Sequence, residues 1–411
     1  MRTGMLLCAV VCVGSCLIVG CGGDDGGGPN PVTGVDITPD KANLEIGHST
    51  NIAATVSGGD NKDLTWSVNG IVNGNATYGT ITQNSPVTYN APDALPSPRT
   101  VVIGAVSVED TSKVDTCRIA VQFTKLFVDS ATGDDDTATG CVNIPYRTIT
   151  EARKQATSGM TILVRPGTYS EALGEDFPIY VPSGVSLVGE DWESCIIRRE
   201  TAETNYNAAI RFSGDDATVR KLTIRDQKPE DTRWDTPIYI NTRNNMVDSV
   251  RILEYGHSSC IDIYGATNAI VQNCVIDVQA DILDAKITGR GINLYNDDQG
   301  TIIRNCRFTG CVIAIRGSGI SDALVEGCIL EHCIYGANLC CDYHETSNPV
   351  FDFGGGARGS AGGNVFRYYD ECGLLNQGNA TVYAKYNTWH NDPPVEGQDY
   401  CVTGGGSIVV E

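Results

Sequence analysis

The chain is poor in basic residues. Its 411 residues include 29 Lys and Arg against 50 Asp and Glu, which gives a formal net charge of −21. A surface of this sign repels the phosphates of nucleic acids and anionic lipid headgroups, so neither is expected as a broad partner. It also repels a bare acidic polysaccharide. Aromatic residues are few, at 7%, while glycine is abundant, with 46 residues, a balance that favours a turn-rich β protein.

Apolar runs long enough to span a bilayer are also lacking. The leader has Arg2 and an apolar stretch from Met5 to Val19, which is too short for a comfortable span. Its end, Ile18-Val19-Gly20-Cys21, resembles the bacterial lipobox, whose cysteine is lipidated. The resemblance implies a signal peptide over 1–20, a lipid anchor on Cys21 and export to a membrane surface, with sorting to the outer membrane where the source has one. An ordinary cleaved secretory signal is the alternative.

The cysteines do not form an obvious disulfide framework. Of the 17, four lie in the leader, and the thirteen that remain cannot all pair within one chain. Several recur at the same position of the repeat described below, which favours packing as small buried hydrophobic residues.

Residues 21–33 form a Gly- and Asp-rich tether that cannot pack a core. The segment 34–122 then alternates short apolar runs with turn residues, which predicts a β-sandwich. The residues Ile37-Thr38-Pro39, Leu64 to Val68 with Trp66, Gly79-Thr80-Ile81 and Tyr89 to Pro92 resemble bacterial Ig-like repeats of surface proteins. The resemblance implies a spacer or an adhesive unit, and Cys117 has no partner for an Ig-type disulfide.

The C-terminal half repeats one short phrase of alternating residues. Its copies begin at Val219, Val247, Val271, Ile303 and Val325, roughly 22 to 32 residues apart. Repeats of this length predict a solenoid, and each copy has strand periodicity.

The entry to this region carries a more specific pattern. The residues are Phe127-Val128-Asp129, Gly133-Asp134, Pro145 to Ile149, Ala152, Ala156, Gly159, Ile162, Pro166 to Tyr169, Gly174 to Ile179 and Gly184 to Gly189. They resemble the entry of right-handed parallel β-helices of the pectate-lyase superfamily and are similar to an uncharacterised bacterial domain family of that superfamily, over about 124–390. We therefore expect an all-β chain with a β-helix over 123–411. Thr148 and Glu151 predict a capping box for a short helix that Gly159 ends.

Stacked coils bring equivalent residues into columns. We expect one column of Cys274, Cys306 and Cys328, and another of Cys260, Cys311 and Cys333. Asn273 and Asn305 are predicted to pair between coils. A second set of segments also aligns: Pro237 to Ile240, Cys260 to Ile263, Gly291 to Leu294, Cys311 to Ile315 and Cys333 to Gly336. Ala384 to Trp389 resembles a closing rung, so Asp392 to Glu411 is expected to cover the exit.

Two insertions at the same point of the repeat, Asp226 to Asp235 and Asp277 to Arg290, are expected to stand two coils, about 10 Å, apart. Tyr255-Gly256-His257 lies on the coil between them. The predicted cleft has Trp234, Tyr255, His257 and Arg233 as sugar-binding residues. Its acidic residues suit Ca²⁺, which prefers six to eight oxygen ligands: Asp226, Asp231, Asp235, Asp277, Asp281 and Asp284.

The cleft favours a glycan-binding or adhesive surface protein whose partner is a polysaccharide or cell-surface glycan. The alternative is a Ca²⁺-dependent polysaccharide lyase acting on acidic polysaccharide. The superfamily resemblance implies that Lys286 or Arg290 would then be the base, although its conserved catalytic signatures are not evident. Asp277 and Asp281 could instead serve glycoside hydrolysis. Solvated loops on a structural envelope protein are the third interpretation.

Two smaller clusters have structural alternatives. Cys328, His332, Cys333, Cys340, Cys341 and His344 could bind zinc, but their spacing matches no common zinc module, so core packing is favoured. Asp134-Asp135-Asp136 could bind Ca²⁺, but a solvated turn is favoured.

Overall fold

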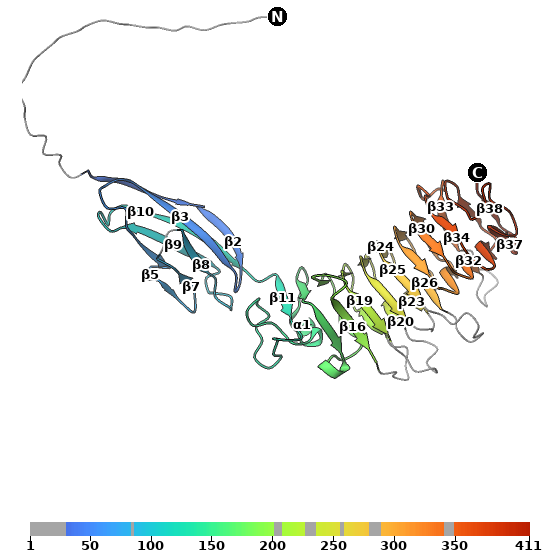
Figure 1. Ribbon diagram of the computed structural model, residues 1–411, viewed down its shortest axis with the longest axis horizontal. Coiled ribbons are helices and arrows are strands. Elements are labelled where there is room, and N and C mark those ends of the chain that lie inside the picture. Colours follow the sequence, from blue (N-terminus) through green and yellow to red (C-terminus); the bar gives the residue numbers. More distant parts are fainter. Residues whose placement is uncertain are drawn as a thin grey trace, which may run out of the picture.

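The computed structural model describes residues 30–83, 86–200, 208–226, 236–254, 259–278, 289–340 and 349–411 (Figure 1). The predicted fold class is confirmed: a β-sandwich precedes a parallel β-helix that carries one short helix near its entry. Cys21 and the leader lie outside the described residues.

The sandwich packs two sheets whose strands pair antiparallel except for β2 and β10, with strand orders β1-β3-β8-β7-β6 and β2-β10-β9-β4-β5. Trp66 and Tyr89 fill its core, and Cys117 is buried there without a disulfide. The strands are β1 (Val32–Thr38), β2 (Lys41–Glu45), β3 (Ser49–Gly58), β4 (Leu64–Val68), β5 (Ile71–Val72), β6 (Gly74–Asn75), β7 (Gly79–Ile81), β8 (Val87–Asn90), β9 (Thr100–Ser107) and β10 (Val114–Gln122).

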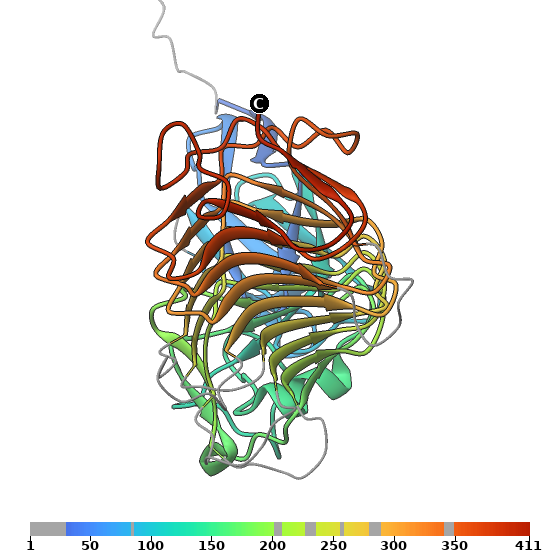
Figure 2. The ribbon, with the colours of Figure 1, turned by 90° about the vertical axis from the view of Figure 1, so that its right-hand side faces the viewer.

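The β-helix winds through three parallel sheets, seen nearly end-on in Figure 2. Sheet 1 contains β11 (Lys125–Val128), β12 (Thr161–Val164), β15 (Ser186–Gly189), β18 (Thr218–Arg220), β21 (Met246–Asp248), β24 (Ile270–Gln272), β27 (Thr301–Arg304), β30 (Asp322–Glu326), β33 (Val350–Gly354), β36 (Thr381–Ala384) and β38 (Ser407–Val409).

Sheet 2 contains β13 (Gly167–Ser170), β16 (Cys195–Arg199), β19 (Thr223–Asp226), β22 (Arg251–Glu254), β25 (Val275–Val278), β28 (Arg307–Thr309), β31 (Ile329–Glu331) and β34 (Val365–Arg367). Sheet 3 contains β14 (Ile179–Val181), β17 (Ala208–Phe212), β20 (Thr236–Ile240), β23 (Ser259–Tyr264), β26 (Arg290–Tyr295), β29 (Ile313–Ser318), β32 (Tyr335–Cys340), β35 (Cys372–Asn376) and β37 (Tyr400–Val402).

The predicted stacking of the cysteines is confirmed for the column of Cys274, Cys306 and Cys328 and for the pair of Cys311 and Cys333, but Cys260 lies instead in the column of Gly291 and Ala314. Cys306 lies beside both Cys274 and Cys328, and Cys311 lies beside Cys333; these side chains are buried and are not disulfide-bonded. Burial and the neighbouring thiols raise the pKa of Cys274 and Cys306 well above the usual value. The thiols therefore pack as small apolar groups.

The predicted amide pair between Asn273 and Asn305 is wrong. The Asn273 amide donates instead to Asp248 Oδ1 at 2.7 Å, on the preceding coil. Asn273 and Asn305 have φ values of +56° and +54°, a left-handed conformation that asparagine tolerates, and this explains their recurrence. An asparagine pair does form at another turn, where Asn268 Nδ2 donates to Asn244 Oδ1 at 3.1 Å.

Helix α1 (Ile149–Gln155) closes the first coil. The Thr148 hydroxyl accepts from the Glu151 amide, as the capping box predicts, but the Thr148 amide donates to Asp135 rather than to Glu151. The helix ends at Gln155, four residues before Gly159, so the predicted stop is misplaced. The 3₁₀ turn η1 (Glu171–Leu173) precedes Glu175, whose buried carboxylate accepts from the Ile149 and Thr150 amides.

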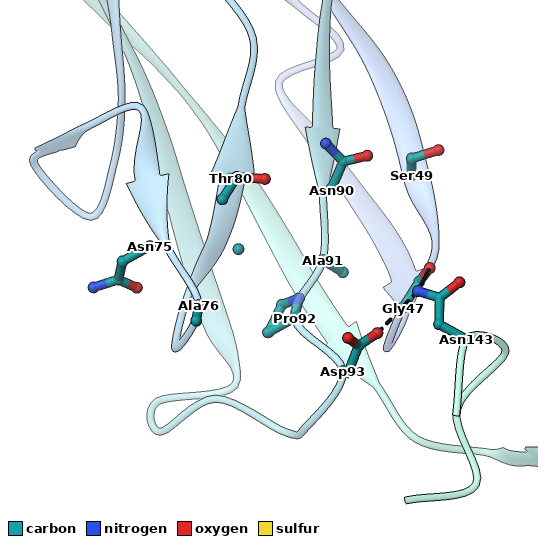
Figure 3. Close-up of a pocket in the computed structure, with 11 residues that line it drawn as sticks. Gly47, Ser49, Asn75, Ala76, Thr80, Asn90, Ala91, Pro92, Asp93 and Asn143 are labelled. Carbon is teal, nitrogen blue, oxygen red and sulfur yellow. Dashed lines mark hydrogen bonds between the residues drawn. The ribbon is translucent and has the colours of Figure 1, made fainter. Parts of the chain in front are cut away.

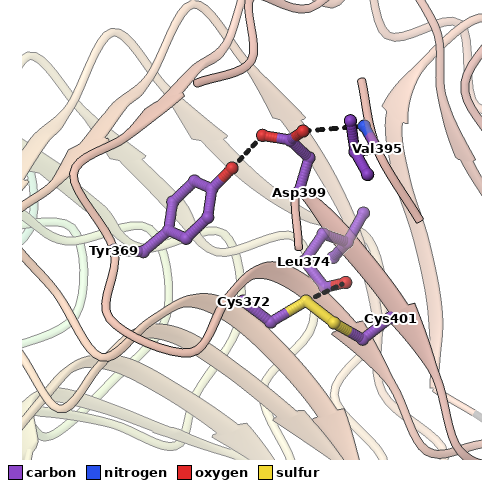
Figure 4. The surroundings of a disulfide bond; sticks show 6 residues. All are labelled: Tyr369, Cys372, Leu374, Val395, Asp399 and Cys401. Carbon is purple, nitrogen blue, oxygen red and sulfur yellow. Dashed lines mark hydrogen bonds between the residues drawn. A yellow bond between two sulfur atoms is a disulfide. The ribbon is translucent and has the colours of Figure 1, made fainter. Parts of the chain in front are cut away.

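The last coil continues beyond the predicted closing rung. Trp389 is buried and stacks on Phe366, with ring centroids 4.6 Å apart, but the chain then adds β37 and β38 to the sheets rather than simply covering the exit. A disulfide between Cys372 and Cys401 joins β35 to β37 (Figure 4). Beside it, the Asp399 carboxylate accepts from the Val395 amide at 2.7 Å and from the Tyr369 hydroxyl.

Candidate functional site

The predicted cleft falls mostly outside the described residues. The predicted cleft residues that are not described are Asp231, Arg233, Trp234, Asp235, Tyr255, His257, Asp281, Asp284 and Lys286. The flanking strands are described: 227–235 lies between β19 and β20, 255–258 between β22 and β23, and 279–288 between β25 and β26. The predicted phase is therefore right, since each segment leaves sheet 2 and enters sheet 3 on successive coils.

Three predicted residues have described backbones, and the structure does not unite them. Asp226 and Asp277 lie on β19 and β25, two coils apart as predicted, but Asp226 is in register with Glu254 whereas Asp277 is in register with Leu253. They therefore belong to neighbouring columns rather than one. Arg290 begins β26 on sheet 3, in register with Ser259 and Ile313, so it lies on a different sheet from Asp277.

The outer face of sheet 3 carries a cluster of polar and aromatic residues. Along these strands the isoleucines and leucines point into the core, for example Ile261, Ile263 and Ile292. Because neighbouring residues of a strand face opposite sides, the residues between them face outward. Together with Arg290, whose charge acts on Asp262, these outward residues form a set that we call the sheet 3 patch: Tyr239, Asp262, Tyr264, Arg290, Asn293, Tyr295 and Arg316.

A polar ladder runs across the sheet 3 patch, perpendicular to the strands. Tyr239, Asp262, Asn293 and Arg316 are in register on four successive strands. Arg316 Nη1 donates to Asn293 Oδ1 at 3.0 Å, and Asn293 Nδ2 donates to Asp262 Oδ1 at 3.0 Å. The asparagine thereby connects the guanidinium to the carboxyl group, and each member orients the next.

Three tyrosines, one of them Tyr239 of the ladder itself, form an aromatic cluster in the patch. The Tyr239 and Tyr264 rings lie 6.4 Å apart at 25°, and the Tyr264 and Tyr295 rings meet edge to face at 4.8 Å. The Arg211 guanidinium lies 4.7 Å from the centre of the Tyr239 ring. Tyr264 is still 39% exposed, so the cluster presents an aromatic edge to solvent beside buried polar groups.

Asp262 is the chemically distinctive member of the sheet 3 patch. Only 7% of this residue is exposed, and burial raises the pKa of its carboxyl group. The hydrogen bond from Asn293 acts in the opposite direction. The positive charges of Arg290 and Arg316 also favour the carboxylate. A carboxyl group with opposed influences of this kind can donate or accept a proton, so the patch contains a possible acid or base.

Asp298, behind the patch, has a structural role. It is fully buried, and its two oxygens accept from the Ala266 and Tyr295 amides, each at 2.7 Å. Burial raises its pKa to about 8. Its contacts pin the turn that follows Tyr295 and thereby hold the tyrosine in place.

Within the described ranges, no group of three or more His, Cys, Asp or Glu is placed to hold a metal ion. Cys328 and Cys333 are buried in the core, while Cys341 and His344 lie outside the described residues. Asp135 accepts from the Arg147 and Thr148 amides, so it braces the entry loop. In the described part of the chain, no helix is long and apolar enough to cross a membrane.

An open pocket of about 480 Å³ lies where the sandwich meets the first coil (Figure 3). Asn143 Nδ2, from the β-helix entry, donates to Gly47 O at 3.1 Å and to Asp93 Oδ1 at 2.9 Å in the sandwich. These contacts use the polar groups at the pocket's edge to join the two domains. The pocket therefore marks a joint, and the sheet 3 patch is the stronger candidate site.

Comparison with known families gives one decisive match: the model of a protein of unknown function (DUF1565) matches residues 131–396. The chain belongs to the DUF1565 family. The match covers most of the β-helix, including every residue of the sheet 3 patch, and excludes the sandwich. It agrees with the extent of the resemblance found in the sequence, but the family description assigns no activity.

Solved structures similar to this DUF1565 protein include a rhamnogalacturonan lyase, which is 12% identical over 70% of this chain and 85% of that chain, with a TM-score of 0.48. Pectin methylesterase PemA from Erwinia chrysanthemi is 13% identical over 58% and 78%, with a TM-score of 0.37. An alginate lyase from Paenibacillus sp. is 11% identical over 64% and 95%, with a TM-score of 0.31. These similarities are too low to indicate an activity. No curated protein matches the chain.

Sequence reasoning missed most of the sheet 3 patch, although the signal was present. The aligned segments around Ile238, Ile261 and Ile292 place Tyr239, Asp262 and Asn293 at the same outward position of the repeat. Such a ladder is indicated when the same strand position, flanked by core residues on both sides, holds a polar or aromatic residue on several successive coils. Of the predicted site residues, Arg290 alone belongs to the patch.

Proposed function

We propose that this DUF1565 protein binds a carbohydrate on the sheet 3 patch. The observation that carries the proposal is the joining of three tyrosines to an ordered Asp–Asn–Arg ladder on one outward face. Sugars have apolar C–H faces and a rim of hydroxyl groups, so aromatic rings beside fixed hydrogen-bonding groups are complementary to them.

The polar ladder supplies both kinds of hydrogen-bonding partner. Arg316 offers only donors, Asp262 accepts when ionised and donates when protonated, and Asn293 fixes their separation. Tyr264 contributes an exposed ring edge and a hydroxyl group. Since these groups are held by strands rather than loops, the site is largely ordered before a ligand arrives, which lowers the entropic cost of binding.

The leader sequence is consistent with display of the protein outside the cell. A lipid on Cys21 would anchor the chain to a membrane, the tether and sandwich would hold the β-helix away from it, and the partner would be a polysaccharide or cell-surface glycan. This part of the proposal rests on the leader sequence. Labelling with a radioactive or alkyne-bearing fatty acid tests it: the label should be lost in Cys21→Ser.

Binding is tested by electrophoresis of the purified protein through native gels that contain polysaccharides. We expect at least one polysaccharide to retard the wild-type protein. Tyr264→Ala should weaken the interaction about tenfold, which corresponds to roughly 1.4 kcal/mol. Tyr383→Ala is the matched control, because Tyr383 is 37% exposed on a strand of sheet 1 and should bind normally. Equal retardation of the Tyr264 variant and the wild type would refute the proposed site.

A second candidate function is Ca²⁺-dependent polysaccharide lysis, with Arg290 or Lys286 as the base. The effect of the Arg290 charge on Asp262 favours it, since a guanidinium then acts on a protonatable carboxyl group of the patch. Ca²⁺ is expected to bind the acidic residues of the adjoining segments and to offset their repulsion of an acidic sugar. A lyase would generate unsaturated ends that absorb in the ultraviolet.

The lyase is tested with acidic polysaccharides in the presence of Ca²⁺ or EDTA. A Ca²⁺-dependent absorbance rise that Lys286→Ala or Arg290→Ala abolishes supports lysis. Retardation in gels without any absorbance rise supports binding alone. If the protein shows neither retardation nor an absorbance rise, a structural envelope protein is the remaining interpretation.

A further inference from the structure

From β18 onward, every coil has a residue in the left-handed conformation at the turn from sheet 1 to sheet 2. In chain order these residues are Lys221, Ser249, Asn273, Asn305, Gly327, Gly363 and Tyr386, with φ between +54° and +71°. The Gly363 amide donates to Tyr386 O at 2.8 Å, which ties the last two turns together. Glycine and asparagine suit this conformation, whereas a bulky residue there is an outlier.

The strain at Tyr386 is not offset by burial. Tyr386 is 72% exposed, the highest value among the exposed large hydrophobic side chains of the described residues. Within that part of the chain, no ring–ring or cation–π contact involves it. Tyr368 provides the contrast: it is also left-handed, with φ of +54°, but its ring stacks on His332 at 5.0 Å. A strained residue that packs little is a candidate for function.

The Tyr386 side chain lies against a glycine-rich floor. A Cβ atom placed on Gly355 would lie 3.2 Å from Tyr386 Cε2, and one on Gly362 would lie 3.1 Å from Tyr386 Cβ. Asp352 braces this loop by accepting from the Gly354 and Gly356 amides, each at 3.0 Å. The ring is thus supported by backbone on one side and open to solvent elsewhere.

We propose that Tyr386 is the platform of a second carbohydrate site, on which one pyranose ring stacks. The site is separate from the sheet 3 patch: Tyr386 follows β36, which lies more than four coils, about 20 Å along the axis, beyond β23. It does not rest on the function proposed for the patch. The last coils are the reddest part of the ribbon and lie at the end opposite the sandwich (Figure 1).

The surroundings favour a sugar over a protein partner. Lys385 packs beside the same floor, and Arg358 in the glycine-rich loop pairs with Asp322. A protein interface of stable size would need an extended apolar patch, whereas one open ring among polar side chains suits a single sugar unit.

The test uses native gels that contain polygalacturonate, alginate, xylan, mixed-linkage β-glucan or soluble chitosan as probes. Tyr386→Asn restores the residue type of the earlier turns and removes the ring. We expect it to weaken retardation about tenfold in at least one gel. Tyr386→Trp, which keeps an aromatic face, should retain binding. Tyr368→Asn is the matched control, with the same substitution at another exposed left-handed tyrosine whose ring stacks on His332.

The readouts separate the two sites. Loss of binding in Tyr386→Asn but not in Tyr264→Ala supports the second site alone, and the reverse supports the patch alone. Melting temperatures identify a structural role: we expect Tyr386→Asn to melt no lower than the wild type. The proposal is overturned if no probe retards the wild type, if Tyr386→Asn binds as well as the wild type, or if it melts at a clearly lower temperature.

Discussion

At the scale of single residues, buried carboxylates accept hydrogen bonds from backbone amides that have no partner in the sheets. Glu175 accepts from the first two amides of α1, Asp352 from the glycine-rich loop, and Asp399 from the last turn. Each satisfies backbone N–H groups that have no partner in a sheet, at a place where a coil begins, bulges or ends. The acidic composition is therefore partly architectural.

Glu175→Ala should destabilise the entry of the β-helix. The variant leaves the Ile149 and Thr150 amides buried without their acceptor, a loss of about 3 kcal/mol. Denaturant unfolding measures it. Asp176→Ala is the control, because that neighbouring residue is exposed and its change should be nearly neutral. Equal stability of both variants would mean that Glu175 does not cap the helix.

Asp298 predicts a pH dependence with a definite sign. Its pKa in the folded protein, about 8, lies above its ordinary value of 3.8, so the folded state binds the proton more tightly than the unfolded state. The contribution to stability is complete below pH 4 and is lost as pH rises to about 8, by up to about 1.4 kcal/mol per pH unit. Asn cannot titrate, so the stability difference between wild type and Asp298→Asn should shrink over this window.

Urea unfolding at pH values between 4 and 8 measures that difference. Comparison with Asp298→Asn removes the general effect of the protein's net charge, which is present in both proteins. Parallel stability curves for the two proteins would contradict the assignment of Asp298.

At the scale of elements, the repeat was predictable because one alternating phrase recurs and its isoleucines must face one core. The column of Cys274, Cys306 and Cys328 followed from the same alignment, whereas Cys260 was assigned to the wrong column. The Asn273 pairing failed because the sequence does not reveal that this residue is left-handed and points toward Asp248. The position of Gly159 likewise suggested a helix end that Ala156 already provides.

The patch was harder to predict because its residues lie on regular strands of sheet 3, whereas the insertions are the irregular parts of the repeat. Asp262 becomes distinctive only when its burial, the Asn293 amide and the Arg316 charge are placed together. Arg290 was predicted because it ends an insertion, yet its neighbours come from the two adjoining coils. To predict which residues share a column, one needs the register between strands of successive coils. Because the repeat varies in length, the sequence determines this register only to within one residue, as Asp226 and Asp277 illustrate.

The disulfide predicts local stabilisation of the last coil. Cys372 and Cys401 are 29 residues apart, and closing a loop of this size stabilises by about 3 kcal/mol. Cys401→Ser should therefore increase hydrogen exchange in β35 and β37, with little change in β14 or β17 at the other end. Cys340→Ser, at a half-buried cysteine of β32, is the control. Uniform acceleration along the β-helix would contradict a local role.

At the scale of the whole molecule, the sandwich and the β-helix meet through a defined joint (Figure 1). The Thr124 amide donates to Glu45 Oε2 at 2.9 Å, and Asn143 reaches Gly47 and Asp93. The joint leaves the sheet 3 patch uncovered by the sandwich, because every strand of the patch lies several coils beyond β11. The sandwich therefore does not block the approach of a ligand to Tyr264, which is 39% exposed.

The most direct measurement of the central claim is hydroxyl-radical footprinting of the protein with and without a polysaccharide that retards it in gels. We predict that oxidation of Tyr264 falls when the protein is saturated, whereas the exposed Tyr368 serves as an unchanged reference. Full oxidation of Tyr264 in the saturated protein would show that the sugar binds elsewhere and would contradict the assignment of the patch.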